Sequence, residues 1–327
     1  MRRRLCMVLI GVMVGFFMLA DAPKIFAEPV KLKAVGFIAK NHPVIAMAAE
    51  WVKQVNAELK GQIEIDYPGG PEVIPTMQQG DALKNGVIDI NFNIPVFMES
   101  MFPEGWALFA SKYTPSEERK PGGFYEFMVK RYQRINMMYL GRWLSCPFYI
   151  WTNKSISSWR GLEGMKIRST THFDRFLKKM GAVPVNIMPS DVYTALERGT
   201  VDGFGWPLSG ARELGWTDKC KYIIDHPFHA SNNAVILMNL GAWNKLSKDV
   251  QDKIMQITVK FEPEMVAYFQ KKDAEEWIEV EKVGVKRIHF SQNDAKEYID
   301  IIYGVDWEIL TEKVPELVPE LKRVTGN

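Results

Sequence analysis

Apolar and polar positions alternate with two different periods along the first third of the chain. Period-two alternation over residues 30–37 and 61–67 indicates two strands, and a short apolar run over residues 87–92 indicates a third. Between them, apolar residues recur at helical spacing over residues 43–59 and 73–85. This strand–helix–strand–helix–strand order predicts parallel strands joined by right-handed crossovers. The loops after the first and third strands should then lie at the edge where such sheets bind ligands.

The alternation returns in the middle of the chain, which predicts a second lobe. Short strands and helices alternate over residues 161–223, and residues 135–140 indicate a strand before them. Residues 143–153 are aromatic and irregular, and residues 233–239 are apolar, so we expect both to cross between the lobes. Residues 247–283 predict one long helix, kinked by the proline that it contains.

The first 27 residues predict a secretory signal peptide. Residues 2–4 are all arginine, residues 5–20 are apolar, and Ala27 is a small residue at the expected cleavage point. The apolar run is short for a membrane span, which needs about 20 residues. An uncleaved anchor is the alternative. We therefore expect a periplasmic protein that is not embedded in the membrane after cleavage.

The net charge gives no support for nucleic acid as a partner, and the sequence does not decide whether the two remaining cysteines form a disulfide. Residues 1–27 hold four basic residues and one acidic residue, so their removal moves the net charge from +2 to −1. A nearly neutral chain gives no electrostatic reason to expect nucleic acid as a partner. Cys146 and Cys220 remain, and an exported chain could pair them or leave them free.

The most informative stretch surrounds one arginine. Residues 165–168 carry the apolar side chains of Met165 and Ile167 and end in Arg168, so this cation lies at the carboxyl end of a predicted strand. A guanidinium there can grip a carboxylate through two parallel hydrogen bonds. Downstream, residues 191–203 contain Val-Tyr-Thr-Ala-Leu and end in Val-Asp-Gly, which predicts a helix followed by another strand.

In order and spacing, these segments resemble the solute-binding subunit of TRAP (tripartite ATP-independent periplasmic) transporters, the DctP-type family. The resemblance implies that Arg168 clamps the carboxylate of a ligand. It also implies the fold class α/β, a two-lobed periplasmic-binding-protein-like fold (type II) with parallel-rich sheets, hinge-crossing strands and a long kinked helix. We assign lobe I to residues 28–148 plus about 236–275, and lobe II to residues 149–235 plus about 276–327.

The chain departs from the family pattern at two places. Tyr149 stands where many relatives have a second arginine, and it could still donate a hydrogen bond. Arg142 is an alternative replacement for that cation. Gly205 stands where some members have an acidic metal ligand, and Trp206 follows it. A site with one cation and an added tryptophan should favour one carboxylate with an apolar or aromatic body.

Four further residues beside predicted strand ends are candidate ligand contacts, although packing or turn formation also explains them: Phe37, Phe204, Asn93 and Asn233. His42, at the start of the first helix opposite the cleft, is a weaker candidate.

No cofactor or metal is expected, and no enzymatic activity. His226 and His229 are separated by a proline, and the sequence offers them no evident third ligand. The sequence also lacks a Gly-x-Ser-x-Gly elbow, a phosphate loop and a dinucleotide fingerprint.

The predicted function is an extracytoplasmic receptor that captures an organic acid and delivers it to a TRAP-type membrane permease. Aromatic or apolar monocarboxylates, including 2-oxo acids, rank first as ligands, and small aliphatic mono- or dicarboxylates rank second. A binding protein of an ATP-driven importer is an alternative, because the fold would not separate the two. A periplasmic enzyme is a further alternative that the missing catalytic constellation disfavours.

Overall fold

Ten strands form one hydrogen-bonded network in the computed structural model, which describes residues 28–327 except the side chains at 171, 172 and 230–232. The strands are β1 (Val30–Gly36), β2 (Ile63–Gly69), β3 (Ile90–Asn93), β4 (Met137–Thr152), β5 (Lys166–Ser169), β6 (Val183–Asn186), β7 (Gly203–Trp206), β8 (Tyr222–Ile224), β9 (His229–Asn239) and β10 (Lys286–Ile288). The predicted signal peptide lies outside the described residues.

Helices surround these strands. The α-helices are α1 (Ala46–Glu58), α2 (Gln79–Lys84), α3 (Ala107–Ala110), α4 (Pro115–Glu118), α5 (Phe124–Gln133), α6 (Thr171–Lys179), α7 (Val192–Glu197), α8 (Leu240–Lys245), α9 (Lys248–Lys282), α10 (Gln292–Lys313) and α11 (Val318–Thr325). Within the described residues, every helix is too short or too polar to cross a membrane.

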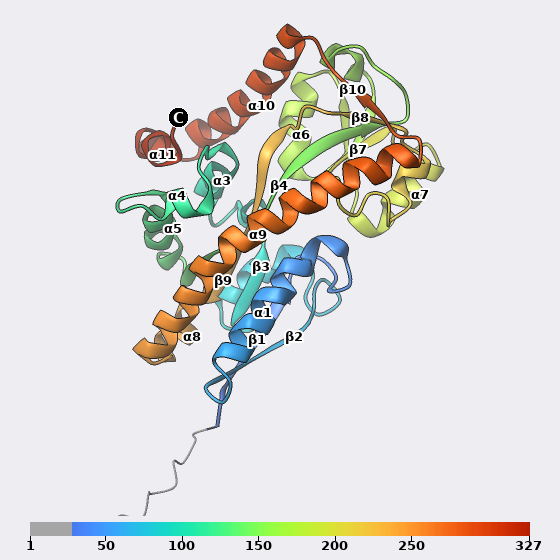
Figure 1. Ribbon diagram of the computed structural model, residues 1–327. Helices are drawn as coiled ribbons and strands as arrows, with labels where there is room; N and C mark the ends of the chain where they lie inside the picture. Colours follow the sequence, from blue (N-terminus) through green and yellow to red (C-terminus); the bar gives the residue numbers. More distant parts are fainter. Residues whose placement is uncertain (1–27) are drawn as a thin grey trace, which may run out of the picture.

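The strand order β2-β1-β3-β9-β4-β7-β5-β6 divides the network into two lobes (Figure 1). In lobe I, β1 pairs in parallel with β2 and β3. In lobe II, β5 pairs in parallel with β6 and β7. The β1-α1-β2-α2-β3 order agrees with the sequence prediction. In β2, Ile63, Ile65 and Tyr67 are buried and alternate with exposed residues, as one covered sheet face requires.

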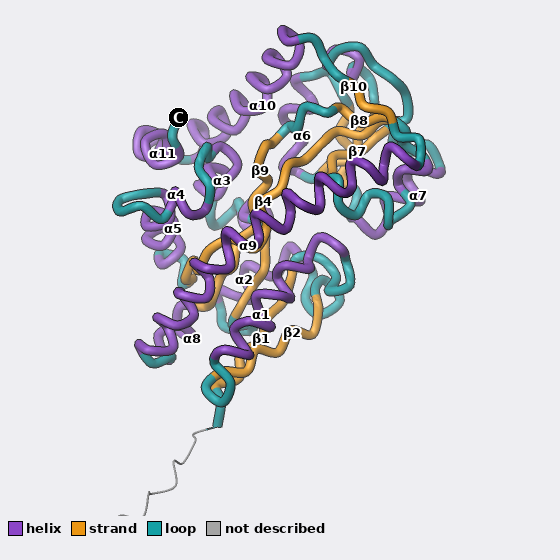
Figure 2. The backbone as a smooth tube through the Cα atoms, in the orientation of Figure 1, coloured by secondary structure: helices purple, strands orange, loops and turns teal. Residues whose placement is uncertain are grey.

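Two long antiparallel strands, β4 and β9, run side by side between the lobes (Figure 2). We expected a strand over residues 135–140 and an irregular crossing over 143–153, and this division is wrong, because β4 is continuous for 16 residues. Its pairing with β9 shifts register three times, and one shift falls between Cys146 and Phe148. The proline between them is tolerated there because a bulge needs no ladder hydrogen bond from that residue.

One helix is long enough to touch both lobes. α9 contains 35 residues, continues through Pro263, and packs against α1, α4 and β4 (Figure 1). Trp51 of α1 donates a hydrogen bond from its indole to the Thr258 hydroxyl of α9, over 3.1 Å. The helix predicted over residues 247–283 is therefore confirmed.

The carboxyl terminus returns to lobe I. α10 packs against α6 in lobe II and against α3, and α11 packs against α3 and α5. Asn327 donates from its side-chain amide to the Ala110 carbonyl, over 2.7 Å. The predicted lobe boundaries stay a prediction, but these contacts separate α11 from the lobe II group to which we assigned residues 276–327.

Cys146 and Cys220 are both buried and free. Burial raises the pKa of both thiols, so neither favours the thiolate at neutral pH. The open pairing question is thereby answered for this structure, and the fold rests on packing rather than on a disulfide bridge.

Candidate functional site

A cavity of about 470 Å³ lies where the strand ends of the two lobes meet. The loops after β1 and β3 supply Phe37 and Phe97 from lobe I, as we expected of those loops. β4 supplies Phe148, α6 supplies Phe173, and the segment before α7 supplies Met188. Most of the wall is therefore aromatic or aliphatic, and only a few polar groups can orient a ligand.

Arg168, at the end of β5, brings a positive charge to this apolar wall. Its side chain is fully buried, and its Nε donates to the Ile187 carbonyl over 2.8 Å. Nη1 lies 3.5 Å from the Gly205 carbonyl, at the limit for a hydrogen bond, and Nη2 has no partner among the described residues. No described carboxylate forms an ion pair with it.

Burial without a neighbouring anion lowers the pKa of Arg168 to about 9. The guanidinium therefore stays protonated at neutral pH, although its surroundings disfavour the charge. A buried cation of this kind is normally compensated, since unpaired charges are costly in a protein interior. The site can accept an anionic group at Nη2.

Trp206, at the end of β7, lies next to this cation. The guanidinium carbon of Arg168 is 5.3 Å from the centre of its ring. Its Nε1–H is buried and has no hydrogen-bond partner among the described residues. The ring packs edge-on against Trp216, with centroids 5.1 Å apart, which fixes its orientation.

His42 supplies another buried donor from lobe I. The Val44 amide donates to His42 Nδ1 over 3.2 Å, so the neutral ring carries its proton on Nε2. That Nε2 is buried without a partner, and burial lowers the pKa of His42 to about 4. The ring centroids of His42 and Trp206 are 5.6 Å apart, so the two donors lie close together.

Gly210 lets the backbone approach both rings. Its φ is +93°, which disfavours any residue with a side chain. A Cβ at this position would lie 3.4 Å from Trp206 Nε1 and 3.6 Å from His42 Cε1. It would therefore occupy space beside the two unpartnered donors.

Of the eight residues that we proposed as ligand contacts, three line this cavity: Arg168, Trp206 and Phe37. Five do not: Tyr149, Phe204, Asn93, Asn233 and Arg142. The weaker candidate His42 lines it as well. Their binding roles stay proposals, but the geometry separates residues that a ligand in this cavity could touch from those it could not.

Tyr149 faces the opposite side of β4 from Phe148. Its ring packs edge-on against Trp277 of α9, with centroids 5.4 Å apart. Phe204 is fully buried and stacks on Trp151, with centroids 5.5 Å apart. Alternation along a strand sends neighbouring side chains to opposite faces, so Phe148 enters the cavity where we had expected Tyr149.

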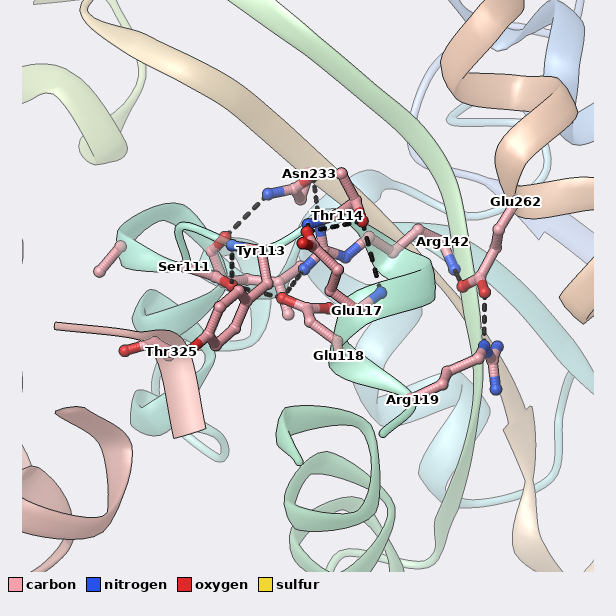
Figure 3. A network of polar contacts seen from close by, with 12 residues as sticks. Ser111, Tyr113, Thr114, Glu117, Glu118, Arg119, Arg142, Asn233, Glu262 and Thr325 are labelled. Atoms are coloured by element: carbon pink, nitrogen blue, oxygen red, sulfur yellow. Dashed lines mark hydrogen bonds and ion pairs between the residues drawn. The ribbon is translucent and has the colours of Figure 1, made fainter. Parts of the chain in front are cut away.

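The remaining polar candidates belong to buried networks. Figure 3 shows Arg142, which donates from Nη1 to Asn233 Oδ1 over 2.8 Å and forms an ion pair with Glu118. Asn233 also donates to the Leu108 carbonyl over 2.8 Å. Asn93 donates to Asn91 Oδ1 over 2.7 Å. Arg142 therefore has an anion of its own, and it does not line the cavity.

The wall residues that sequence reasoning missed carry weak signals. Phe148 and Phe173 look like core aromatics, and Met188 precedes a proline, as many loop residues do. His42 carried a clearer signal, because a side chain before Pro43 can cap the helical turn that follows.

Comparisons with known proteins agree with this architecture. The sequence profile of bacterial extracellular solute-binding protein, family 7 (DctP), matches residues 35–305. The monocarboxylate 2-oxoacid-binding periplasmic protein all3028 of Nostoc sp. (strain PCC 7120) is 23% identical over 256 residues, covering 75% of this chain and 70% of the relative.

Two solved structures share the fold. A TRAP periplasmic solute-binding protein from Desulfovibrio salexigens, with bound orotic acid, gives a TM-score of 0.80 at 17% identity, covering 90% of this chain and 97% of the other. DctP7 of Bordetella pertussis, an extracytoplasmic solute receptor binding pyroglutamic acid, gives 0.78 at 15% identity, covering 91% and 100%. At these identities, the likeness shows the two-lobed α/β fold.

Proposed function

The chain belongs to the DctP family of bacterial extracellular solute-binding proteins, the TRAP type, and we propose that its cavity captures a monocarboxylate with an apolar body. Members of this family are solute receptors for organic acids rather than enzymes. The observation that carries the proposal is Arg168, a buried cation on the cavity wall whose Nη2 has no partner among the described residues.

Three N–H groups without partners among the described residues determine which groups the polar end of the ligand should carry. They are Nη2 of Arg168, Nε1 of Trp206 and Nε2 of His42, and all three are donors. A carboxylate can accept from Arg168, and an oxygen on the adjacent carbon can accept from Trp206 or His42. A 2-oxo acid carries both acceptors, which is why it ranks first. The Nostoc relative, whose name describes a monocarboxylate 2-oxoacid-binding protein, supports this ranking.

The apolar end of the ligand would occupy the aromatic part of the wall. Phe37, Phe148 and Phe173 line the cavity and leave room for a branched or aromatic body. Among the described residues on the wall, Arg168 is the only charged cation. A dicarboxylate would therefore lack a counter-charge for its second carboxylate, which favours acids with one.

We further propose that the lobes close on the ligand about β4 and β9, and that the closed form delivers the acid to a TRAP-type permease in the membrane. Closure would be favoured by the ligand only to the extent that it binds the closed state more tightly. The predicted signal peptide would direct this receptor to the periplasm.

A thermal-shift screen of organic acids on residues 28–327 tests the proposal. The parent is compared with Arg168→Met, which keeps the size of the side chain and removes its charge. The matched control is Arg160→Met, because the Arg160 side chain is 56% exposed and pairs with Asp294 and Glu297 outside the cavity. A ligand at 100 times its Kd stabilises by about 2.7 kcal/mol, which is a shift of several degrees.

We expect a branched or aromatic 2-oxo acid to raise the unfolding midpoint of the parent and the control but not of Arg168→Met. An equal shift in Arg168→Met would show that Arg168 does not hold the carboxylate. A panel without any response in the parent would contradict the choice of ligand class.

A further inference from the structure

A second cluster of polar side chains lies in lobe II, at the paired ends of β8 and β10. These strands run parallel, and Ile224 is the register partner of Ile288. The Asp225 amide continues the ladder by donating to the Ile288 carbonyl over 3.0 Å. Because both strands end at the same level, the next residues, Asp225 and His289, are held side by side.

His226 completes the cluster. Nδ1 of His289 lies 3.1 Å from one carboxylate oxygen of Asp225, and Nε2 of His226 lies 3.7 Å from the other. The two imidazole rings have centroids 4.8 Å apart, and one ligand atom from each of the three residues lies within 4.8 Å of the others. Nε2 of His226 is buried and makes no hydrogen bond with the described residues.

We propose that Asp225, His226 and His289 form a binding site for zinc or a similar transition-metal ion. Zinc binds imidazole nitrogen at about 2.0–2.1 Å and carboxylate oxygen at about 2.0–2.2 Å, so tetrahedral ligand atoms lie roughly 3.4 Å apart. Measured to the same carboxylate oxygen of Asp225, Oδ1, the distances are 3.3 Å from Nδ1 of His289 and 3.7 Å from Nε2 of His226, which bracket that separation. Small side-chain rotations would bring the three ligand atoms around one ion.

Ligand type selects the metal class. Two imidazoles and one carboxylate suit zinc, copper, nickel or cobalt, whereas calcium and magnesium prefer oxygen ligands. The side chain of His289 is 74% exposed, so a water molecule can reach the fourth position. The neighbouring cation Arg287 pairs with Glu281 over 2.6 Å, which compensates its charge.

Such an ion would join two segments that are distant in sequence. His226 lies three residues before β9 begins at His229, and His289 lies shortly before α10, whose N-cap is Ser291. A bound metal would therefore link the segment before β9 to the segment before α10. This role is independent of the organic acid cavity, because none of the three residues lines it.

Calorimetric titration of zinc chloride into untagged residues 28–327, stripped with a chelator, tests the site. We expect one ion per chain, and we expect Asp225→Asn, His226→Ala and His289→Ala each to weaken binding at least tenfold. Asp300→Asn is the matched control, because it removes an exposed carboxylate of α10 that pairs with Lys296 outside the cluster. It should bind zinc as the parent does.

Calcium and magnesium titrations complete the test and should produce no saturable binding. Absence of saturable zinc binding in the parent would overturn the proposal. So would unchanged binding in the three cluster variants, or an equal loss in Asp300→Asn, which would indicate general attraction to surface carboxylates.

Discussion

The guanidinium of Arg168 faces the ring of Trp206 at 5.3 Å, and each side chain keeps one buried N–H without a partner. The cation–π contact is worth about 0.5–2 kcal/mol, far less than full compensation for a buried charge. In the unliganded protein, the buried charge of Arg168 therefore lowers the free energy of unfolding, and an anionic ligand would remove this destabilisation. This relationship links ligand binding to stability and leads to the first prediction.

We predict that Arg168→Met stabilises the unliganded protein by about 1 kcal/mol or more, because replacing buried charges with apolar groups of similar volume is often stabilising. Urea unfolding of parent and variant without any acid measures the difference. The lost hydrogen bond to the Ile187 carbonyl opposes the gain but is the smaller effect. A clear loss of stability in the variant would show that Arg168 is already compensated.

Trp206→Phe should weaken binding of the acid about tenfold or more while leaving the fold intact. The change removes Nε1–H but keeps an aromatic ring, and a hydrogen bond to a charged group contributes about 1.5–3 kcal/mol. Calorimetry with the best acid from the screen measures the loss. Trp159→Phe is the control, because that indole donates to Glu297 outside the cavity. Similar affinities for the parent and Trp206→Phe would mean that Nε1 does not contact the ligand.

His42 should make stability depend on pH between about 4 and 6.5. Its folded-state pKa, about 4, lies below the usual histidine value of 6.5, so in this window the unfolded chain binds a proton that the folded chain does not. Stability from this residue is complete above pH 6.5 and declines as the pH falls towards 4, by about 1.4 kcal/mol for each pKa unit.

The variant His42→Asn isolates that contribution. Asparagine can still accept from the Val44 amide as an N-cap, but it does not titrate. Unfolding free energies measured by urea at several pH values should fall less steeply for the variant than for the parent. Parallel curves would indicate that His42 is protonated as easily in the folded protein as in the unfolded chain.

Arg142 should matter for stability and not for ligand choice. Arg142→Met should cost about 3–5 kcal/mol, because it strands the buried Glu118 carboxylate. The double variant Arg142→Met, Glu118→Gln should recover most of that loss, as urea unfolding would reveal. A change in acid preference, with stability unaffected, would instead place Arg142 in the ligand site.

Much of the framework could be predicted, because short parallel strands and their helices have clear periodicity. The position of Arg168 near a strand end follows from a short segment in which Met165 and Ile167 are apolar, and the structure has β5 there. The long helix was equally plain, because helical spacing persists on both sides of Pro263.

The faces of β4 could not be predicted in this way. Each bulge moves the following side chains to the other face, and the three register shifts along β4 depend on its partner β9. Phe148 therefore lines the cavity, and Tyr149, which we had proposed as a ligand contact, packs against Trp277 of α9. The partner of Arg142 could not be predicted for a similar reason: its anion, Glu118, comes from α4, and nothing in the local pattern joins the two.

The order of strands has a consequence for how the chain is made. β9 lies between β3 and β4 in the sheet, although the residues of β3 and β4 are synthesised well before those of β9, which ends at residue 239. Most of the polypeptide must therefore be synthesised before β3 can pair with β9 in lobe I. Pairing between strands so distant in sequence is slow. For a chain exported by its predicted signal peptide, such a delay would favour the unfolded state during translocation.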